Sequence, residues 1–587
     1  MKDNAYKSAM EKLPVSKNLE EKTMALLTSS HMAKKREERK MKTKWVKMIG
    51  SLAAACLVLA IVVPALVPGE RTADTGIVGV EAQFSETVAR KSLGMVAPGE
   101  VQYEAEADAM FYAAAPLAGH VEWNTEEFNY ISENRFLSAR LSPLSTFAAD
   151  ADTASYAKLR SAILRGDIPP VDSVRIEEML NYFVYDYKKP EKGEPFGVTT
   201  EIADCPWNAD TKLLLIGLQA EKIETDNLPA QNLVFLIDVS GSMDSPDKLP
   251  LAVRAFKLVL EELKPTDTVA IVTYASGDRV VLDGVRASDK VRIMEALDSL
   301  MAGGGTAGAA GINTAYDIAQ KHLIKGGNNR VILATDGDLN IGVSSEGDLT
   351  RLVEEKREGG VFLSVLGFGS GNYKDNKLEA LADHGNGNYA YIDTIFEARK
   401  ALVEELGATF FTVAKDVKLQ VEFNPAKIKG YRLIGYENRL LNAEDFKDDT
   451  KDGGEIGSGH RMTALYEIVP IDSQMAIDEI ETKYQTTAGT DSAEWLTVNL
   501  RCKAPDGDTS TLYSYPVDET AYVAEMSDNM RFASAVAETG MLLRDSEFKG
   551  TASYAEVLER LRGTKSVTGD VYKEEFQYLV TKLGREK

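Results

Sequence analysis

The sequence predicts an α/β fold in which a doubly wound, mainly parallel sheet is inserted in an antiparallel β-sandwich. Within residues 229–412, short apolar runs alternate with helical periodicities, which is typical of parallel strands covered by helices on both faces. On either side of that region, strands that alternate apolar and polar residues indicate a sandwich. Residues 517–587 show helical spacing, and one apolar segment near the N-terminus predicts a transmembrane helix.

The composition limits the class of protein. The chain has 587 residues, with 67 basic and 90 acidic side chains, a formal charge of −23 and 44% apolar residues. These values suit several globular domains and exclude a collagen-like, wholly disordered or multi-pass membrane protein. The acidity argues against nucleic acid as a partner, because that binding needs a dense basic surface.

Three cysteines, Cys56, Cys205 and Cys502, are too few and too scattered for a disulfide scaffold or a cysteine-based zinc site. The sequence leaves open whether Cys205 and Cys502 form a single disulfide, since it does not fix the distance between them.

The N-terminal part predicts a membrane anchor. Residues 1–47 form a basic head with 13 basic and 6 acidic side chains, and Met48–Val67 is an uncharged run of 20 residues, about the length that spans a bilayer as a helix. Because positive flanks stay in the cytoplasm, we expect a single-pass cell-membrane protein with a cytoplasmic N-terminus and residues 69–587 outside the cytoplasm. Residues 68–123 are acidic and rich in Ala and Gly, so we expect a flexible linker.

Three other interpretations of the apolar run fit the sequence less well. A cleaved signal peptide needs a much shorter basic region and a small-residue cleavage site. A lipoprotein would use Cys56, which lies in the middle of the run with few apolar residues before it. A buried helix of a soluble domain is normally amphipathic rather than apolar all round.

The strands of the sandwich are expected on both sides of the α/β region. In residues 124–228, Ser155–Asp186 has the spacing of two helices broken by Ile168-Pro169-Pro170, and Thr199–Ile223 holds two strand-like runs. In residues 413–516 the alternating pattern returns, so we expect a sandwich that the α/β domain divides. The predicted strands there are Val417–Phe423, Tyr431–Tyr436, Met462–Val469 and Trp495–Arg501, and the predicted helices beyond them are Met526–Arg544, Tyr554–Leu561 and Tyr572–Leu583.

Residues 229–412 carry the alternation of strand and helix. The predicted strands are Leu233–Ile237, Thr268–Tyr274, Val331–Thr335, Val361–Leu366 and Tyr389–Ile392. The predicted helices are Leu249–Leu263, 289–301, 309–324, 347–358, one more before Tyr389, and Phe396–Phe411. Sites in such sheets form where loops leave the carboxyl ends of the strands.

Three loops at that edge carry the candidate chemistry. They are Asp238-Val239-Ser240-Gly241-Ser242, Gly303-Gly304-Gly305-Thr306 and Asp336-Gly337. Together they offer two carboxylates and three hydroxyls, and no thiolate or histidine. Such all-oxygen ligands suit a hard cation, Mg²⁺ first and Mn²⁺ or Ca²⁺ next.

The motifs DVSGSM, GGGTAG and ATDGD resemble the metal-ion-dependent adhesion site of von Willebrand factor type A (VWA) domains. The resemblance implies the same doubly wound fold over about residues 229–412. It implies that Ser240 and Ser242 bind Mg²⁺ directly, that Thr306 binds directly or through water, and that Asp238 and Asp336 act largely through waters.

The resemblance extends beyond the motifs. The stretch that begins NTEEFNYISENRFLSARLSPLSTFAADADTASYAKL, and the C-terminal MRFASAVAETGMLLRDS, are similar to bacterial YfbK-type VWA proteins, so that the likeness covers about residues 124–587. This resemblance indicates the domain architecture of the chain better than it indicates the function of the protein.

The function that follows is a non-enzymatic one. Mg²⁺ takes six oxygens and the chain supplies only part of that shell, so we expect an exposed Asp or Glu of a protein partner to complete it. A metal-dependent hydrolase is the alternative, since carboxylates and a divalent ion can activate water. A structural metal, with binding through the sandwich, is the third. The sequence names neither the partner nor the oligomeric state, and it leaves open whether the metal site is open or closed and whether the basic head signals.

Overall fold

The computed structural model describes most of the chain from residue 128 onwards. The described ranges are 128–149, 152–223, 229–305, 308–337, 346–369, 375–404, 411–451, 453–477, 489–505 and 507–586. The basic head, the apolar run Met48–Val67, the expected linker and Thr306 lie outside them. Within the described ranges, no helix is long and apolar enough to cross a membrane.

A six-stranded sheet with the order β10-β9-β8-β5-β6-β7 forms the α/β domain. Neighbouring strands are parallel except β6 and β7, which are antiparallel. The strands are β5 (Gln231–Asp238), β6 (Thr268–Tyr274), β7 (Asp278–Arg286), β8 (Asn328–Thr335), β9 (Phe362–Phe368) and β10 (Tyr389–Ile392). The helices are α7 (Leu249–Glu262), α8 (Lys290–Asp298), α9 (Gly308–Lys321), α10 (Glu346–Glu358), α11 (Asp375–His384) and α12 (Ile395–Arg399).

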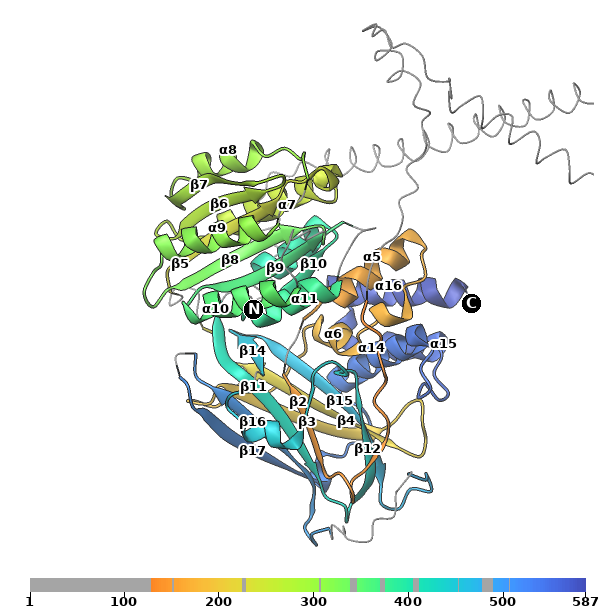
Figure 1. Cartoon of the computed structure of the whole chain (residues 1–587). Coiled ribbons are helices and arrows are strands. Elements are labelled where there is room, and N and C mark those ends of the chain that lie inside the picture. The colour runs from red at the N-terminus through yellow and green to blue at the C-terminus, as the bar shows by residue number, and fades with distance from the viewer. Residues whose placement is uncertain are drawn as a thin grey trace, which may run out of the picture. The chain divides into compact units, whose positions relative to one another are not determined.

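Helices cover both faces of this sheet, and the alternation within each strand explains how. Phe235 and Ile237 of β5 pack in one apolar core with α7, α8 and α12, whereas Val234 and Leu236 pack in another with α9, α10 and α11. Successive side chains of a strand point to opposite faces, so a strand that is apolar throughout needs cover on both. Figure 1 shows α9, α10 and α11 together on one face. The prediction of a doubly wound sheet is confirmed.

Two antiparallel sheets form the sandwich, with the orders β1-β12-β15-β4-β3 and β13-β2-β11-β16-β17, and β14 pairs with β11. Strands β3 and β4 precede the α/β domain in the chain and β11 follows it, so the domain is an insertion in the sandwich. The strands are β1 (Leu137–Ser138), β2 (Leu144–Ala148), β3 (Phe196–Asp204), β4 (Lys212–Ala220), β11 (Thr412–Phe423), β12 (Ile428–Ile434), β13 (Leu440–Leu441), β14 (Gly454–Gly457), β15 (Arg461–Pro470), β16 (Glu494–Lys503) and β17 (Ser510–Asp518).

A helical region joins segments from the two ends of the described chain. Its helices are α5 (Ala154–Arg165), α6 (Ile176–Asn181), α14 (Asp528–Arg544), α15 (Tyr554–Arg562) and α16 (Val571–Glu586). Tyr156, Phe183, Phe532 and Phe576 meet in its apolar core, with ring centroids between 4.9 and 6.3 Å apart. Figure 1 shows α5 beside α16, and α6 beside α14.

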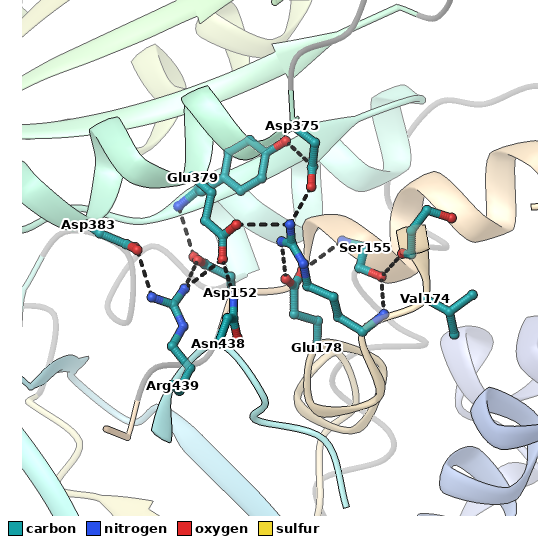
Figure 2. Close-up of polar contacts among 12 residues, drawn as sticks. Asp152, Ser155, Val174, Glu178, Asp375, Glu379, Asp383, Asn438 and Arg439 are labelled. Atoms are coloured by element: carbon teal, nitrogen blue, oxygen red, sulfur yellow. Dashed lines mark hydrogen bonds and ion pairs between the residues drawn. The ribbon is translucent and has the colours of Figure 1, made fainter. Parts of the chain in front are cut away.

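Buried ion pairs attach α11 of the α/β domain to the helical region and to the sandwich. Arg175 pairs with Asp375 at 2.6 Å, with Glu178 at 2.8 Å and with Glu379 at 2.9 Å. Arg439, in the loop between β12 and β13, contacts the other carboxylate oxygen of Glu379 at 3.0 Å. Figure 2 shows Asp375, Glu379 and Asp383 of α11 facing these partners. We call the set the α11 network; its members are Asp152, Arg175, Glu178, Asp375, Glu379, Asp383, Asn438 and Arg439.

A second buried cluster attaches the segment after β10. Arg160 of α5 pairs with Asp393 and with Glu397, the latter at 2.9 Å. The Tyr182 hydroxyl donates to Glu397 at 2.7 Å. Since β10 is a parallel strand that ends at Ile392, this contact lies at the carboxyl edge of the sheet.

The structure also differs from the sequence-based expectations. Strands β1, β2, β7, β13, β14 and β17 were not predicted. Strand β7 pairs only with β6 at the sheet edge and exposes much of its surface, so it lacks the apolar run of the inner strands. Within the expected helix Phe396–Phe411, α12 ends at Arg399 and a π-helical turn covers Lys400–Glu404, while 405–410 lie outside the described residues.

The disulfide left open by the sequence is not formed. Cys205 and Cys502 are both free and buried. Cys205 packs in the core of the helical region and Cys502 in the core of the sandwich, so the two thiols belong to different apolar clusters.

Candidate metal site

The site lies where β5 and β8 end. These strands are parallel neighbours with Ile237 opposite Ala334, so Asp238 and Asp336 follow them at the same edge of the sheet. Asp238 is fully buried and Asp336 is 2% exposed. The sequence therefore placed both carboxylates correctly at one edge, because the carboxyl ends of parallel strands meet there.

Hydrogen bonds fix the Asp238 carboxylate. Its Oδ1 accepts from the backbone N–H of Ser240 at 2.9 Å, and its Oδ2 accepts from the Thr335 hydroxyl at 3.2 Å. Thr335 was missed by sequence reasoning, although its place as the last residue of the apolar run before Asp336 was the available signal. With both oxygens used in this way, Asp238 is suited to hold the loop and to act on a metal through water.

Ser240 and Ser242 offer the hydroxyls. Their Oγ atoms lie 3.0 Å apart. Adjacent corners of an octahedron with Mg²⁺–O bonds of about 2.1 Å are also about 3.0 Å apart. Ser240 is 1% exposed, whereas Ser242 is exposed. The pair thus matches two neighbouring positions of a Mg²⁺ shell that opens towards solvent.

The glycine-rich loop packs against the first loop. The Gly303 N–H donates to the Val239 carbonyl at 2.8 Å, and the Gly241 N–H donates to the Gly304 carbonyl at 3.0 Å. Gly304 has a φ of +88°, a conformation that a side chain would strain. The structure therefore brings two of the three predicted loops into contact. Thr306 lies outside the described residues.

The Asp238 carboxyl at this edge has a shifted pKa. Burial raises the pKa of Asp238 to about 6, and the charge of Asp336 acts in the same direction, while hydrogen bonds from Ser240 oppose them. The two carboxylates and two hydroxyls form a donor set of oxygen alone, which fits a hard divalent cation.

Sequence reasoning missed Lys248. Its Nζ donates to Asp336 Oδ2 at 2.9 Å and to the Ser242 carbonyl at 3.0 Å. Lys248 directly precedes α7, and no motif distinguishes it from the many surface lysines of the chain. Only the fold shows that it reaches the site.

Comparison with known proteins places this geometry in a family. The profile described as "von Willebrand factor type A domain" matches residues 232–405. The profile "Uncharacterized protein YfbK, C-terminal" matches residues 408–585, and "von Willebrand factor" matches 122–215. The protein "Uncharacterized protein YfbK" of Escherichia coli (strain K12) is 40% identical over 487 residues, which cover 81% of this chain and 84% of that protein.

The chain belongs to the YfbK family of VWA proteins. The resemblance predicted from the sequence is confirmed. Outside the YfbK family, the inter-alpha-trypsin inhibitor heavy chain H3 of Mesocricetus auratus is 28% identical over 173 residues, or 28% of this chain and 19% of that protein. Among solved structures, a von Willebrand factor type A protein from Catenulispora acidiphila covers 69% of this chain and 89% of its own, with 19% identity and a TM-score of 0.38.

Proposed function

We propose that this protein is a membrane-anchored, non-enzymatic interaction protein that captures a protein partner through a Mg²⁺-dependent adhesion site. The ligand set is Asp238, Ser240, Ser242, Thr306 and Asp336. The observation that carries the proposal is the pair of serine hydroxyls 3.0 Å apart beside two buried carboxylates at one sheet edge. Membership of the VWA domain family supports an interaction role, because the matched residues 232–405 contain the motifs DVSGSM and ATDGD, which resemble the adhesion site of that domain.

The chemistry of the shell explains capture. Bound Mg²⁺ supplies a strong electrostatic attraction for an additional oxygen ligand. Ser240 and Ser242 supply two neutral oxygens, and Asp238 is already committed to hydrogen bonds with Ser240 and Thr335. The direct ligands Ser240 and Ser242 are therefore neutral, which keeps the ion electrophilic and favours an exposed Asp or Glu of a partner as the next ligand.

The anchor is a separate part of the proposal. Met48–Val67 would span the cell membrane, with residues 1–47 in the cytoplasm and residues 69–587 outside it. Protease added to intact protoplasts should then remove the folded part and leave residues 1–47 protected. Complete protection of the chain would contradict this orientation.

The decisive experiment is capture with and without metal. The full chain, purified in mild detergent, is used as bait for cell-envelope extracts with Mg²⁺ or with EDTA. A partner retained only with Mg²⁺ is expected for the parent, and its loss is expected for Ser242→Ala. Ser245→Ala is the matched control, because the Ser245 hydroxyl donates to Asp247 instead of facing Ser240.

The outcomes separate the three hypotheses. Undiminished Mg²⁺-dependent capture by Ser242→Ala would remove the proposed site. Identical partners in Mg²⁺ and EDTA would favour a structural metal with binding by the sandwich. Hydrolysis of phosphate esters or peptides by the parent, lost in Asp238→Ala, would favour the hydrolase.

A further inference from the structure

Lys248 is a third charged group at the metal-site edge. Its ammonium lies 2.9 Å from Asp336 Oδ2 and 3.0 Å from the carbonyl of Ser242, so it touches one predicted carboxylate and the backbone of one predicted hydroxyl ligand. The side chain of Lys248 is 12% exposed and that of Asp336 is 1% exposed. An ion pair this sheltered is screened by water and salt much less than a surface pair.

The fold holds the lysine stem in place. Gly369, directly after β9, lies against it: a Cβ at Gly369 would come within 2.4 Å of Lys248 Cε and 2.6 Å of Cγ. Gly369 also has a φ of +72°. Its carbonyl accepts a hydrogen bond of 2.8 Å from the Tyr391 hydroxyl of β10. The absence of a side chain at Gly369 therefore makes the space through which Lys248 reaches Asp336.

We propose that Lys248 sets the charge balance of the metal site, lowering its intrinsic affinity for Mg²⁺ and raising the affinity of the loaded site for a carboxylate ligand. This inference rests on the proposed function. With Asp238 and Asp336 ionised and Lys248 charged, the site carries −1, and Mg²⁺ brings it to +1. Without the lysine charge, the loaded site is neutral and attracts an anion less strongly.

The balance has a cooperative consequence. A carboxylate that binds the loaded site neutralises its excess charge, and so Mg²⁺ binds more tightly when the carboxylate is present. By linkage the metal and the carboxylate strengthen each other by the same factor. Lys248 thus makes the site depend on an acidic ligand, whereas a neutral residue in its place gives a site that holds Mg²⁺ by itself.

The test measures Mg²⁺ binding rather than capture. Titration calorimetry of the full chain with MgCl₂ gives the affinity of the parent and of Lys248→Met, which keeps the length of the side chain and removes its charge. We expect Lys248→Met to bind Mg²⁺ about tenfold more tightly, the scale of repulsion between a unit charge and a divalent ion a few ångström apart in water. Replacing chloride by acetate at constant ionic strength should tighten Mg²⁺ binding in the parent and have less effect in the variant.

Three further variants keep the inference open to disproof. Lys257→Met, a lysine within α7 that pairs with the more exposed Asp298, should leave Mg²⁺ affinity unchanged. Lys248→Arg retains the charge and should keep the parent's affinity. Tyr391→Phe removes the bond that anchors Gly369 and should shift Mg²⁺ affinity in the direction of Lys248→Met by a smaller factor; it serves as the test if Lys248→Met does not fold.

The result that overturns the inference is Mg²⁺ affinity in Lys248→Met equal to or weaker than that of the parent. Its failure is distinguishable from failure of the proposed function. If the parent and Lys248→Met both bind no divalent ion, the metal site itself is wrong. If both bind Mg²⁺ with one affinity, the site stands and only the role of Lys248 falls.

Discussion

The α11 network and the metal-site edge both gather buried carboxylates, and they satisfy them in opposite ways. In the α11 network, two guanidinium groups share the carboxylates: Arg175 contacts three and Arg439 contacts three. At the metal edge, Asp238 is held by a backbone N–H and a threonine hydroxyl, and one lysine faces Asp336.

The difference concerns what each cluster is suited to do: the α11 network is suited to joining parts of the fold, and the metal-site edge is suited to accepting a ligand. Guanidinium groups remain charged at every working pH and fit carboxylates in fixed forks, so the α11 network joins three parts of the fold without any external ion. At the metal edge, Asp238 is held by weaker neutral donors, and the hydroxyl oxygens of buried Ser240 and exposed Ser242 face one another. A carboxylate held by neutral donors, as Asp238 is, keeps its charge available to a cation from outside, so the contrast is consistent with the proposed metal site.

The largest expected effect comes from breaking the α11 network. Arg175→Met removes the cation shared by Glu178, Asp375 and Glu379, and should lower the free energy of unfolding by about 3–5 kcal/mol, since it leaves buried charge unpaired. Urea unfolding measures it. Arg165→Met is the control: its pair with Asp167 is exposed, and a loss of at most about 1 kcal/mol is expected. Equal losses in both variants would contradict a structural role for the network.

Mg²⁺ bound at the metal-site edge should stabilise the folded state. At about 100 times its dissociation constant, Mg²⁺ should raise the free energy of unfolding by about 2.7 kcal/mol relative to EDTA. The midpoint of thermal unfolding reports the effect. Ser242→Ala should lose it, while Ser245→Ala and Arg165→Met should retain it. A Mg²⁺ effect that survives in Ser242→Ala would place the ion elsewhere.

A pH test examines another buried carboxylate, Glu177, which directly precedes Glu178 of the α11 network. Burial raises the pKa of Glu177 to about 7, and the charge of Glu437 adds to this, while Arg544 opposes it. A raised pKa means that the folded state binds the proton more tightly than the unfolded state. Stability is therefore lost as pH rises from about 4.5 to 7.

Glu177→Gln should remove that loss. At pH 5 the variant should match the parent, and at pH 8 it should be more stable by about 2 kcal/mol, because the parent must then bury a charge. Urea unfolding at the two pH values gives the comparison. A variant less stable than the parent at pH 8 would show that the ionised carboxylate is well paired with Arg544.

The smallest expected effect concerns the neutral donor at the metal edge. Thr335→Val keeps the shape of the side chain and removes both the hydrogen bond to Asp238 and the one that the Thr335 hydroxyl accepts from the Gly337 N–H, and should cost about 1.5 kcal/mol in the absence of metal. Thermal unfolding in EDTA measures this loss. Thr273→Val, on the neighbouring strand β6 and also buried, is the matched control for the loss of a threonine hydroxyl from the sheet. A loss no larger than that of the control would mean that Thr335 does not hold Asp238.

Much of the fold could be predicted because it depends on the pattern of apolar and polar residues within short stretches of the sequence. The apolar runs that became β5 and β8 are buried along their whole length, and the spacing of Leu249–Leu263 gave α7. Edge strands were harder. Strand β17 exposes much of its surface, so its sequence STLYSYPVD lacks the pattern of a core strand. The candidate site was predictable for the same reason as the inner strands: Asp238 and Asp336 directly follow them.

The sequence by itself determined the alternation of strand and helix, the oxygen-rich motifs at the strand ends and the family, since all of these reside in short stretches of chain. Only the tertiary structure decided which distant side chains meet. Arg175 contacts Asp375, which lies 200 positions further along the chain, and Lys248 contacts Asp336, which lies 88 positions further along. Charged side chains on flexible stems carry no periodic signal, and their partners are fixed only when packed elements exclude water around them.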